Sequence, residues 1–218
     1  MPGEVRPGVD LFWLPLGAGG HFVRLNGRVF EAAVARLEHR STSDLYHSAL
    51  AVRVPEGTFV IEMAWPIPDR DGVRRGVVAE GAVGTRRARS LRTFRYEIRC
   101  WRDGVIPDLD EAVDSPRRLT DDPVLAQRLL ELVPDVPTPV WGRDELRTGE
   151  MWNSNSLISW LIARSGVAVD AVHPPWGGRA PGWRAGVVVA RRQATPPDHV
   201  GREPLRAEIP ASSLTSSR

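Results

Sequence analysis

The chain has 218 residues with a formal net charge of +2, 42% apolar residues and 26% charged residues. This composition is typical of one globular domain and excludes a largely disordered chain. A single cysteine excludes a disulfide framework and a multi-cysteine zinc site. All 29 basic residues are arginine, which indicates a GC-rich bacterial genome. The chain lacks a signal peptide's apolar core and any apolar run of about 18 residues, so a cytoplasmic protein without a membrane span is expected.

The first half of the chain alternates between apolar runs and turn-forming residues, which favours an antiparallel sheet. Residues 1–9 are expected to form a flexible arm, and residues 28–39 carry apolar side chains at helical spacing. Pro55-Glu56-Gly57 is typical of a hairpin turn between two of the strands. The apolar runs predict strands at 11–16, 45–54, 58–65, 77–83 and 93–102.

The second half of the chain is richer in helix signals. Capping residues, an early proline and apolar spacing predict helices over 120–133 and 157–165. A last strand is predicted over 186–191, and residues 193–218 are polar enough to predict a disordered tail. The order of elements predicts a single α+β domain over 10–192, with an antiparallel sheet and helices packed on one side.

One short polar segment has the residues that nucleophilic chemistry needs. Two of the three asparagines in the chain flank Ser154, immediately before a predicted helix. Backbone N–H groups at a helix start are unpaired, and the helix dipole favours negative charge there. Ser154 is therefore a candidate nucleophile, with neighbouring N–H groups as oxyanion donors. Serine and asparagine are also the commonest N-cap residues, so a simple helix cap is the alternative.

Two further residues complete a candidate triad. In the strand 45–54, His47 shares a face with small alanines, where another element can approach closely. Glu62 lies in an apolar stretch of the next strand, and a buried carboxylate needs a partner. A hairpin would place Glu62 near His47, where it would orient the imidazole ring. The alternatives are a core histidine satisfied by its neighbours, and an ion pair between Glu62 and an arginine.

The order of these residues resembles the circularly permuted papain-like hydrolases, which include the PPPDE isopeptidases, lecithin retinol acyltransferase relatives and permuted NlpC-like peptidases. In that group, a histidine on an early strand precedes a nucleophilic cysteine, which opens a late helix in a segment resembling Asn-Cys-Asn-His-Phe. Asn153-Ser154-Asn155-Ser156-Leu157 is similar to that segment, and His47 matches the histidine. The resemblance spans roughly residues 10–190 and implies a permuted papain-like topology with Glu62 in the orienting position.

The resemblance implies a hydrolase or acyltransferase that acts on an amide, ester or thioester bond. Ser154 would attack the carbonyl, His47 would be the general base, and Glu62 would orient His47. The residues expected to bind a small-molecule or peptide substrate are Trp152, Asn153, Asn155, Arg179 and Trp183. Serine stands where the family has cysteine, and the same surroundings activate serine less. A catalytically inactive binding module on this scaffold is therefore the alternative function.

Charge is distributed unevenly along the chain, with a net charge of +7 over residues 74–102 and −7 over residues 103–150. The arginines of 86–95 suggest a third possibility, an anion-binding patch with Tyr96 or Trp101 for stacking. We expect instead that the two blocks offset each other across one surface, so nucleic acid is not the expected partner. The five histidines are scattered, so neither a metal nor a cofactor is expected. The sequence does not indicate an oligomeric state.

Overall fold

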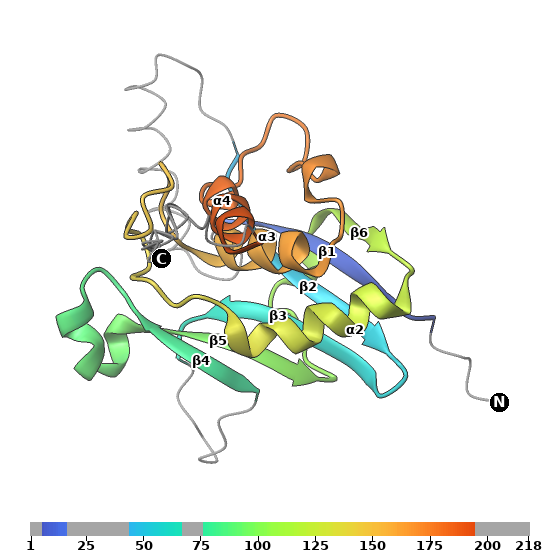
Figure 1. The fold of residues 1–218 in the computed structure, drawn as a ribbon, viewed down its shortest axis with the longest axis horizontal. Helices are drawn as coiled ribbons and strands as arrows, with labels where there is room; N and C mark the ends of the chain where they lie inside the picture. Colours follow the sequence, from blue (N-terminus) through green and yellow to red (C-terminus); the bar gives the residue numbers. More distant parts are fainter. Residues whose placement is uncertain (1–5, 17–43, 67–75, 195–218) are drawn as a thin grey trace, which may run out of the picture.

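The computed structural model describes residues 6–16, 44–66 and 76–194 (Figure 1). The predicted helix over 28–39 lies outside the described residues, as does most of the predicted tail over 193–218. Residues 193 and 194 of that tail are instead the end of a helix, Trp183–Ala194. Within the described residues the fold is α+β, as predicted: one antiparallel sheet with helices packed on one of its faces.

Six strands form the sheet in the order β4-β5-β3-β2-β1-β6, and every neighbouring pair is antiparallel. The strands are β1 (Gly8–Pro15), β2 (Tyr46–Val54), β3 (Gly57–Ala64), β4 (Val77–Ala82), β5 (Arg95–Arg102) and β6 (Val113–Thr120). The five predicted strands are confirmed, and β1 includes residues 8 and 9 of the expected arm. β6 was not predicted, because it is polar and contains Pro116, a residue that sheets accept mainly at an edge.

Three α-helices cover one face of the sheet: α2 (Pro123–Leu132), α3 (Ser154–Ser165) and α4 (Trp183–Ala194) (Figure 1). Both predicted helices are confirmed. Asp122 is the N-cap of α2, and its carboxylate accepts hydrogen bonds from the backbone N–H groups of Val124, at 2.7 Å, and Leu125, at 3.4 Å. Gly166 ends α3 in the left-handed conformation that glycine adopts without steric cost.

The predicted strand over 186–191 is wrong, because these residues lie inside α4. A short apolar run such as Val187-Val188-Val189 does not distinguish a strand from a buried helix. The packing decides the outcome. A Cβ atom on Gly186 would lie 2.0 Å from the backbone oxygen of Ser156, so α4 approaches α3 more closely than any larger residue would allow.

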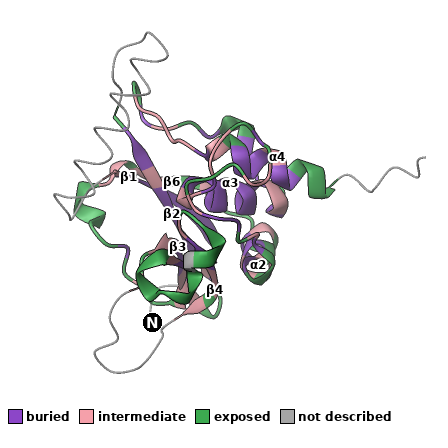
Figure 2. Cartoon of the chain, turned by 90° about the vertical axis from the view of Figure 1, so that its left-hand side faces the viewer, coloured by how far each residue is buried: buried purple, intermediate pink, exposed green. Residues whose placement is uncertain are grey.

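Figure 2 shows buried residues along β1, β2, α3 and α4. The two faces of the sheet bury different sets of side chains. On the helical face, Leu50 and Val52 of β2 pack in one core with Leu157 and Ile158 of α3. On the opposite face, a smaller core contains Phe12, Leu14, Ala49, Ala51, Val60 and Ile106. Alternation along β2 therefore places His47 on this second face with the alanines, as predicted.

Candidate functional site

The start of α3 is a complete capping box. Asn153, not Ser154, is the N-cap. The Oδ1 atom of Asn153 accepts hydrogen bonds from the backbone N–H groups of Asn155, at 2.9 Å, and Ser156, at 3.3 Å. In return, the backbone N–H of Asn153 donates to the hydroxyl oxygen of Ser156 at 3.1 Å. Two of the N–H groups that would otherwise bind an anion are thus already hydrogen-bonded within the helix start.

Asn155 joins three separate parts of the chain. Its side-chain oxygen accepts a hydrogen bond from the hydroxyl of Ser48 on β2 at 2.8 Å. Its side-chain nitrogen donates to the backbone oxygens of Tyr46 and Pro181, each at 2.9 Å. Asn155 and Ser48 are each only 1% exposed, so no substrate reaches them without displacing these contacts. The amide therefore connects α3 to β2 and to the segment that precedes α4.

Two serines, which the sequence analysis did not single out, extend the same contact. The hydroxyl of Ser156 donates to the backbone oxygen of Gly182 at 2.7 Å, and that of Ser159 donates to Trp183 at 2.7 Å. The side-chain nitrogen of Asn153 also donates to the backbone oxygen of Pro181 at 2.8 Å. The sequence signal was the three-residue spacing of Asn153, Ser156 and Ser159, which places them on one helix face. We call Asn153, Asn155, Ser156 and Ser159 with their backbone partners the α3–α4 joint.

Ser154 is the one polar residue of this segment that stays outside the joint. It is the first residue of α3 and is partly exposed, and its hydroxyl has no hydrogen bond to any residue in the described ranges. Its position at a helix start agrees with the prediction. What it lacks is a base, since a nucleophilic serine needs a hydrogen-bonded partner to accept its proton.

His47 lies on the side of the sheet away from α3. Its neighbour Ser48 points to Asn155 of α3, so the His47 side chain leaves β2 on the opposite face, opposite Leu14 of β1 in the register. Burial lowers the pKa of His47 to about 4, and the carboxylate of Asp108 opposes this only in part. The structure does not bring His47 and Ser154 together, because the sheet lies between them.

Glu62 lies on the same face as His47, but its close charged partner is an arginine. Its Oε1 atom is 3.9 Å from Nη1 of Arg99, which lies opposite it on β5. Arg99 in turn pairs with Glu97, with 2.6 Å between Nη2 and Oε2. Burial raises the pKa of Glu62, and Arg99 opposes that shift. This arrangement corresponds to the alternative of an ion pair with an arginine.

The other residues predicted to bind substrate, Trp152, Arg179 and Trp183, make contacts within the protein itself. Trp152 is 2% exposed, and its backbone pairs with Trp141. Trp183 packs against Trp13, with ring centroids 5.1 Å apart. Arg179 ties the preceding loop to β2 through its backbone, whose oxygen accepts from the N–H of Tyr46 at 2.9 Å.

Within the described residues, no group of three or more His, Cys, Asp or Glu side chains is placed to hold a metal ion. None of the described helices is both long and apolar enough to cross a membrane. No family model, curated protein or solved structure matches the chain. The resemblance to the permuted papain-like hydrolases therefore rests on the residues of the sequence alone.

Proposed function

We propose that this chain is a non-catalytic binding module. The observation that supports the proposal is the position of His47, whose side chain leaves β2 on the face opposite α3. A general base must come within hydrogen-bond reach of the hydroxyl that it deprotonates, directly or through one water. A sheet between the two groups separates them by more than that reach. We also propose that the scaffold is related to the permuted papain-like hydrolases. The support for this relationship is the segment that opens α3, Asn153-Ser154-Asn155-Ser156-Leu157.

The α3–α4 joint supports the same proposal. The amide of Asn155 and the hydroxyls of Ser156 and Ser159 are hydrogen-bonded to the protein's own backbone carbonyls, and all three side chains are buried. The polar composition of the segment thus has a structural reason that requires no substrate.

A broad fluorophosphonate probe tests the proposal, because it reacts with serines that a nearby base activates. We expect no labelling of Ser154 in the folded protein, measured by intact-protein mass spectrometry. Wild type and Ser154→Ala should give the same result. Labelling of wild type that disappears in Ser154→Ala would show an activated nucleophile and would overturn the proposal.

A second variant separates a catalytic role of His47 from a structural one. If His47 were the base that activates Ser154, His47→Gln would abolish labelling of Ser154. Circular dichroism would show that the variant remains folded. Under our proposal, His47→Gln leaves the probe result unchanged and alters only stability.

A further inference from the structure

The sheet topology separates the basic block of the sequence from half of the acidic residues in the block that follows it. The arginines of 86–95 lie on the connection between β4 and β5, at one edge of the sheet, in the short helices η1 (Arg86–Ser90) and η2 (Arg92–Phe94) and at the start of β5. The opposite edge is β6, and the acidic residues in and around it are Asp108, Asp110, Glu111, Asp114, Asp121 and Asp122. Glu145 of the acidic block, in contrast, pairs with Arg86 of the basic block, so the expected offset between the two blocks is present only in part.

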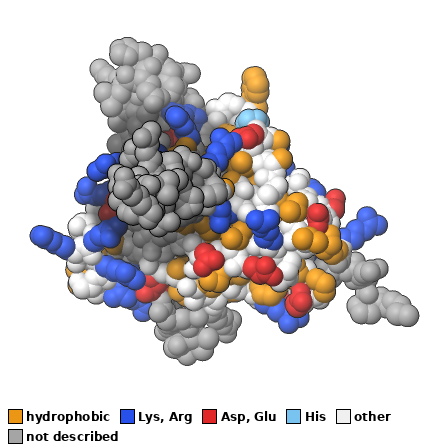
Figure 3. Space-filling view, in the orientation of Figure 1, with side chains coloured by type: hydrophobic (Ala, Val, Ile, Leu, Met, Phe, Trp, Pro, Cys, Tyr) orange, Lys and Arg blue, Asp and Glu red, His pale blue; other side chains and the backbone are white. Residues whose placement is uncertain are grey.

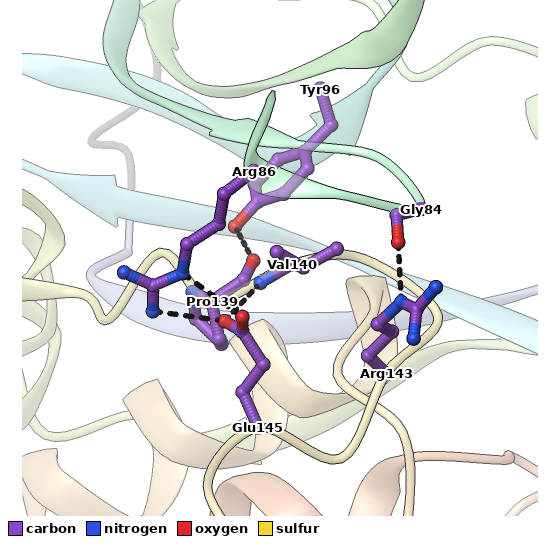
Figure 4. A network of polar contacts seen from close by, with 7 residues as sticks. All are labelled: Gly84, Arg86, Tyr96, Pro139, Val140, Arg143 and Glu145. Atoms are coloured by element: carbon purple, nitrogen blue, oxygen red, sulfur yellow. Dashed lines mark hydrogen bonds and ion pairs between the residues drawn. The ribbon is translucent and has the colours of Figure 1, made fainter. Parts of the chain in front are cut away.

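Hydrogen bonds to backbone carbonyls fix the shape of the arginine-rich connection. The guanidinium of Arg95 donates to the backbone oxygens of Arg89 and Ser90, the second at 3.2 Å. Nη2 of Arg89 lies 3.4 Å from the backbone oxygen of Glu80 on β4. The guanidinium of Arg143 donates to the backbone oxygen of Gly84, just before η1 (Figure 4). The connection is therefore a folded platform that holds its arginines in place.

Glu145 anchors this platform to the segment between α2 and α3 (Figure 4). Its carboxylate accepts two hydrogen bonds from Arg86, at 3.0 and 3.1 Å, and one from the backbone N–H of Val140 at 2.8 Å. The guanidinium of Arg86, followed by the N–H of Val140, lowers the pKa of Glu145. Beside them, the buried hydroxyl of Tyr96 donates to the backbone oxygen of Pro139 at 2.8 Å. Two polar contacts thus hold the β4–β5 connection against the core.

The platform leaves guanidinium groups on the surface. Figure 3 shows arginine side chains gathered at the end of the molecule where β4 and β5 lie. We call the following residues the arginine surface: Arg86, Arg87, Arg89, Arg92, Arg95 and Arg143. Arg86 of this surface pairs with Glu145, and Nη1 of Arg95 lies 3.8 Å from Oε2 of Glu80. Arg87 is exposed and has no hydrogen bond or ion pair with any other described residue.

Exposed aromatic rings accompany these arginines. Phe94, in η2, is 45% exposed among them. Trp65 follows β3, which pairs with β5, and it is 49% exposed. One side of Trp65 packs against Trp141, with ring centroids 5.8 Å apart, and Trp141 is bridged to Val83 beside the platform. An exposed ring that is held by a neighbour offers a stacking surface at little entropic cost.

We propose that the arginine surface binds single-stranded nucleic acid. Guanidinium forks pair with phosphate oxygens in two-point contacts, and aromatic rings stack on bases that are not already paired with a complementary strand. A duplex would offer the phosphates but not the faces of its bases. The inference rests on the proposed function, since it names the partner of the binding module. Binding requires no reaction at Ser154, so its outcome is independent of the probe experiment above.

Fluorescence anisotropy with a labelled oligo(dT) of about 20 nucleotides tests this inference at about 50 to 200 mM salt. We expect Arg87→Gln combined with Arg89→Gln to weaken binding about ten-fold at low salt and to lower the slope of log affinity against log salt by one to two. The matched control is Arg128→Gln combined with Arg184→Gln, which removes the same charge from exposed positions in α2 and α4 and should change affinity less than two-fold. Equal weakening by both pairs would overturn the inference, since it would reflect net charge alone.

Phe94→Ala distinguishes nucleic acid from other polyanions. We expect it to weaken oligonucleotide binding about ten-fold, because one stacked base is lost, and to leave binding of inorganic polyphosphate unchanged. A duplex of the same length should bind more weakly than the single strand. Absence of oligonucleotide binding, equal affinity for single strand and duplex, or binding confined to polyphosphate or to phosphatidylserine vesicles would each overturn the inference.

Discussion

The α3–α4 joint and the arginine surface are both short segments rich in polar side chains, yet they direct their polar groups in opposite ways. In the joint, Asn155 and Ser156 are buried and hydrogen-bonded to backbone carbonyls of other segments. On the arginine surface, Arg95 donates to backbone carbonyls and Arg86 pairs with the Glu145 carboxylate. Arg86, Arg87 and Arg89 nevertheless remain exposed. The polar groups of the α3–α4 joint are hydrogen-bonded within the protein, whereas the arginine surface has N–H donors that stay available to a partner.

This difference follows from side-chain reach. Asparagine and serine place their polar atoms within a few bonds of the backbone, so at a helix start they satisfy local carbonyl and N–H groups. Arginine has five N–H donors at the end of a long chain, so one or two bonds to a carbonyl leave others for solvent or a ligand. A polar segment is therefore a better candidate for binding when its donors outnumber the carbonyls within their reach.

The largest expected effect concerns Asn155, and it tests whether the joint is structural. Asn155→Ala removes three hydrogen bonds and leaves the Ser48 hydroxyl and the Tyr46 carbonyl buried without partners. We expect a loss of about 2–4 kcal/mol in the free energy of unfolding. Urea denaturation followed by circular dichroism measures it. The control is the adjacent Ser154→Ala, which should cost less than about 0.5 kcal/mol. Comparable losses for the two variants would contradict the assigned roles.

The pH dependence of stability tests the position of His47. The folded protein keeps His47 neutral down to a pKa of about 4, whereas the unfolded chain binds a proton near pH 6.5. Between these values the unfolded state holds more protons, so stability falls as pH falls, by about 2–3 kcal/mol in total. His47→Gln should remove this loss between pH 6.5 and 4. A histidine beside an orienting carboxylate would have a pKa at or above 6.5. An NMR titration that gave His47 such a pKa would therefore contradict its assignment as a buried residue on the face away from α3.

The smallest effect concerns Tyr96, which anchors the arginine platform. Tyr96→Phe removes the hydrogen bond to the Pro139 carbonyl while keeping the ring that packs over Gly81. We expect a loss of about 1 kcal/mol in the free energy of unfolding, measured by the same denaturation. The platform should keep its exposed arginines, so affinity for oligo(dT) should change less than three-fold. A much larger loss of affinity would show that the platform depends on this one contact.

Most of the fold was predictable from the sequence, because its strands carry a clear period of two and its helices have capping signals. The two errors have specific causes. β6 is an edge strand whose polar residues gave no periodic signal, and the apolar run of α4 was too short to distinguish helix from strand. The candidate site was predicted less well. Ser154 does lie at a helix start, but its expected base was assigned from an alanine-lined strand face and from residue order, and neither shows which face of the sheet meets α3.

The sequence by itself determined the α+β class, the capping segment at Asn153 and the unequal distribution of charge. These are local properties, fixed by composition and by the spacing of neighbouring residues. The tertiary structure decided which of these groups meet. One residue of register along β2 determines that Ser48, and not His47, faces α3, because successive side chains leave a strand on opposite faces. Strand order places the arginines of 86–95 and the acidic residues around β6 at opposite edges, since pairing between distant segments follows from the packing of the whole sheet.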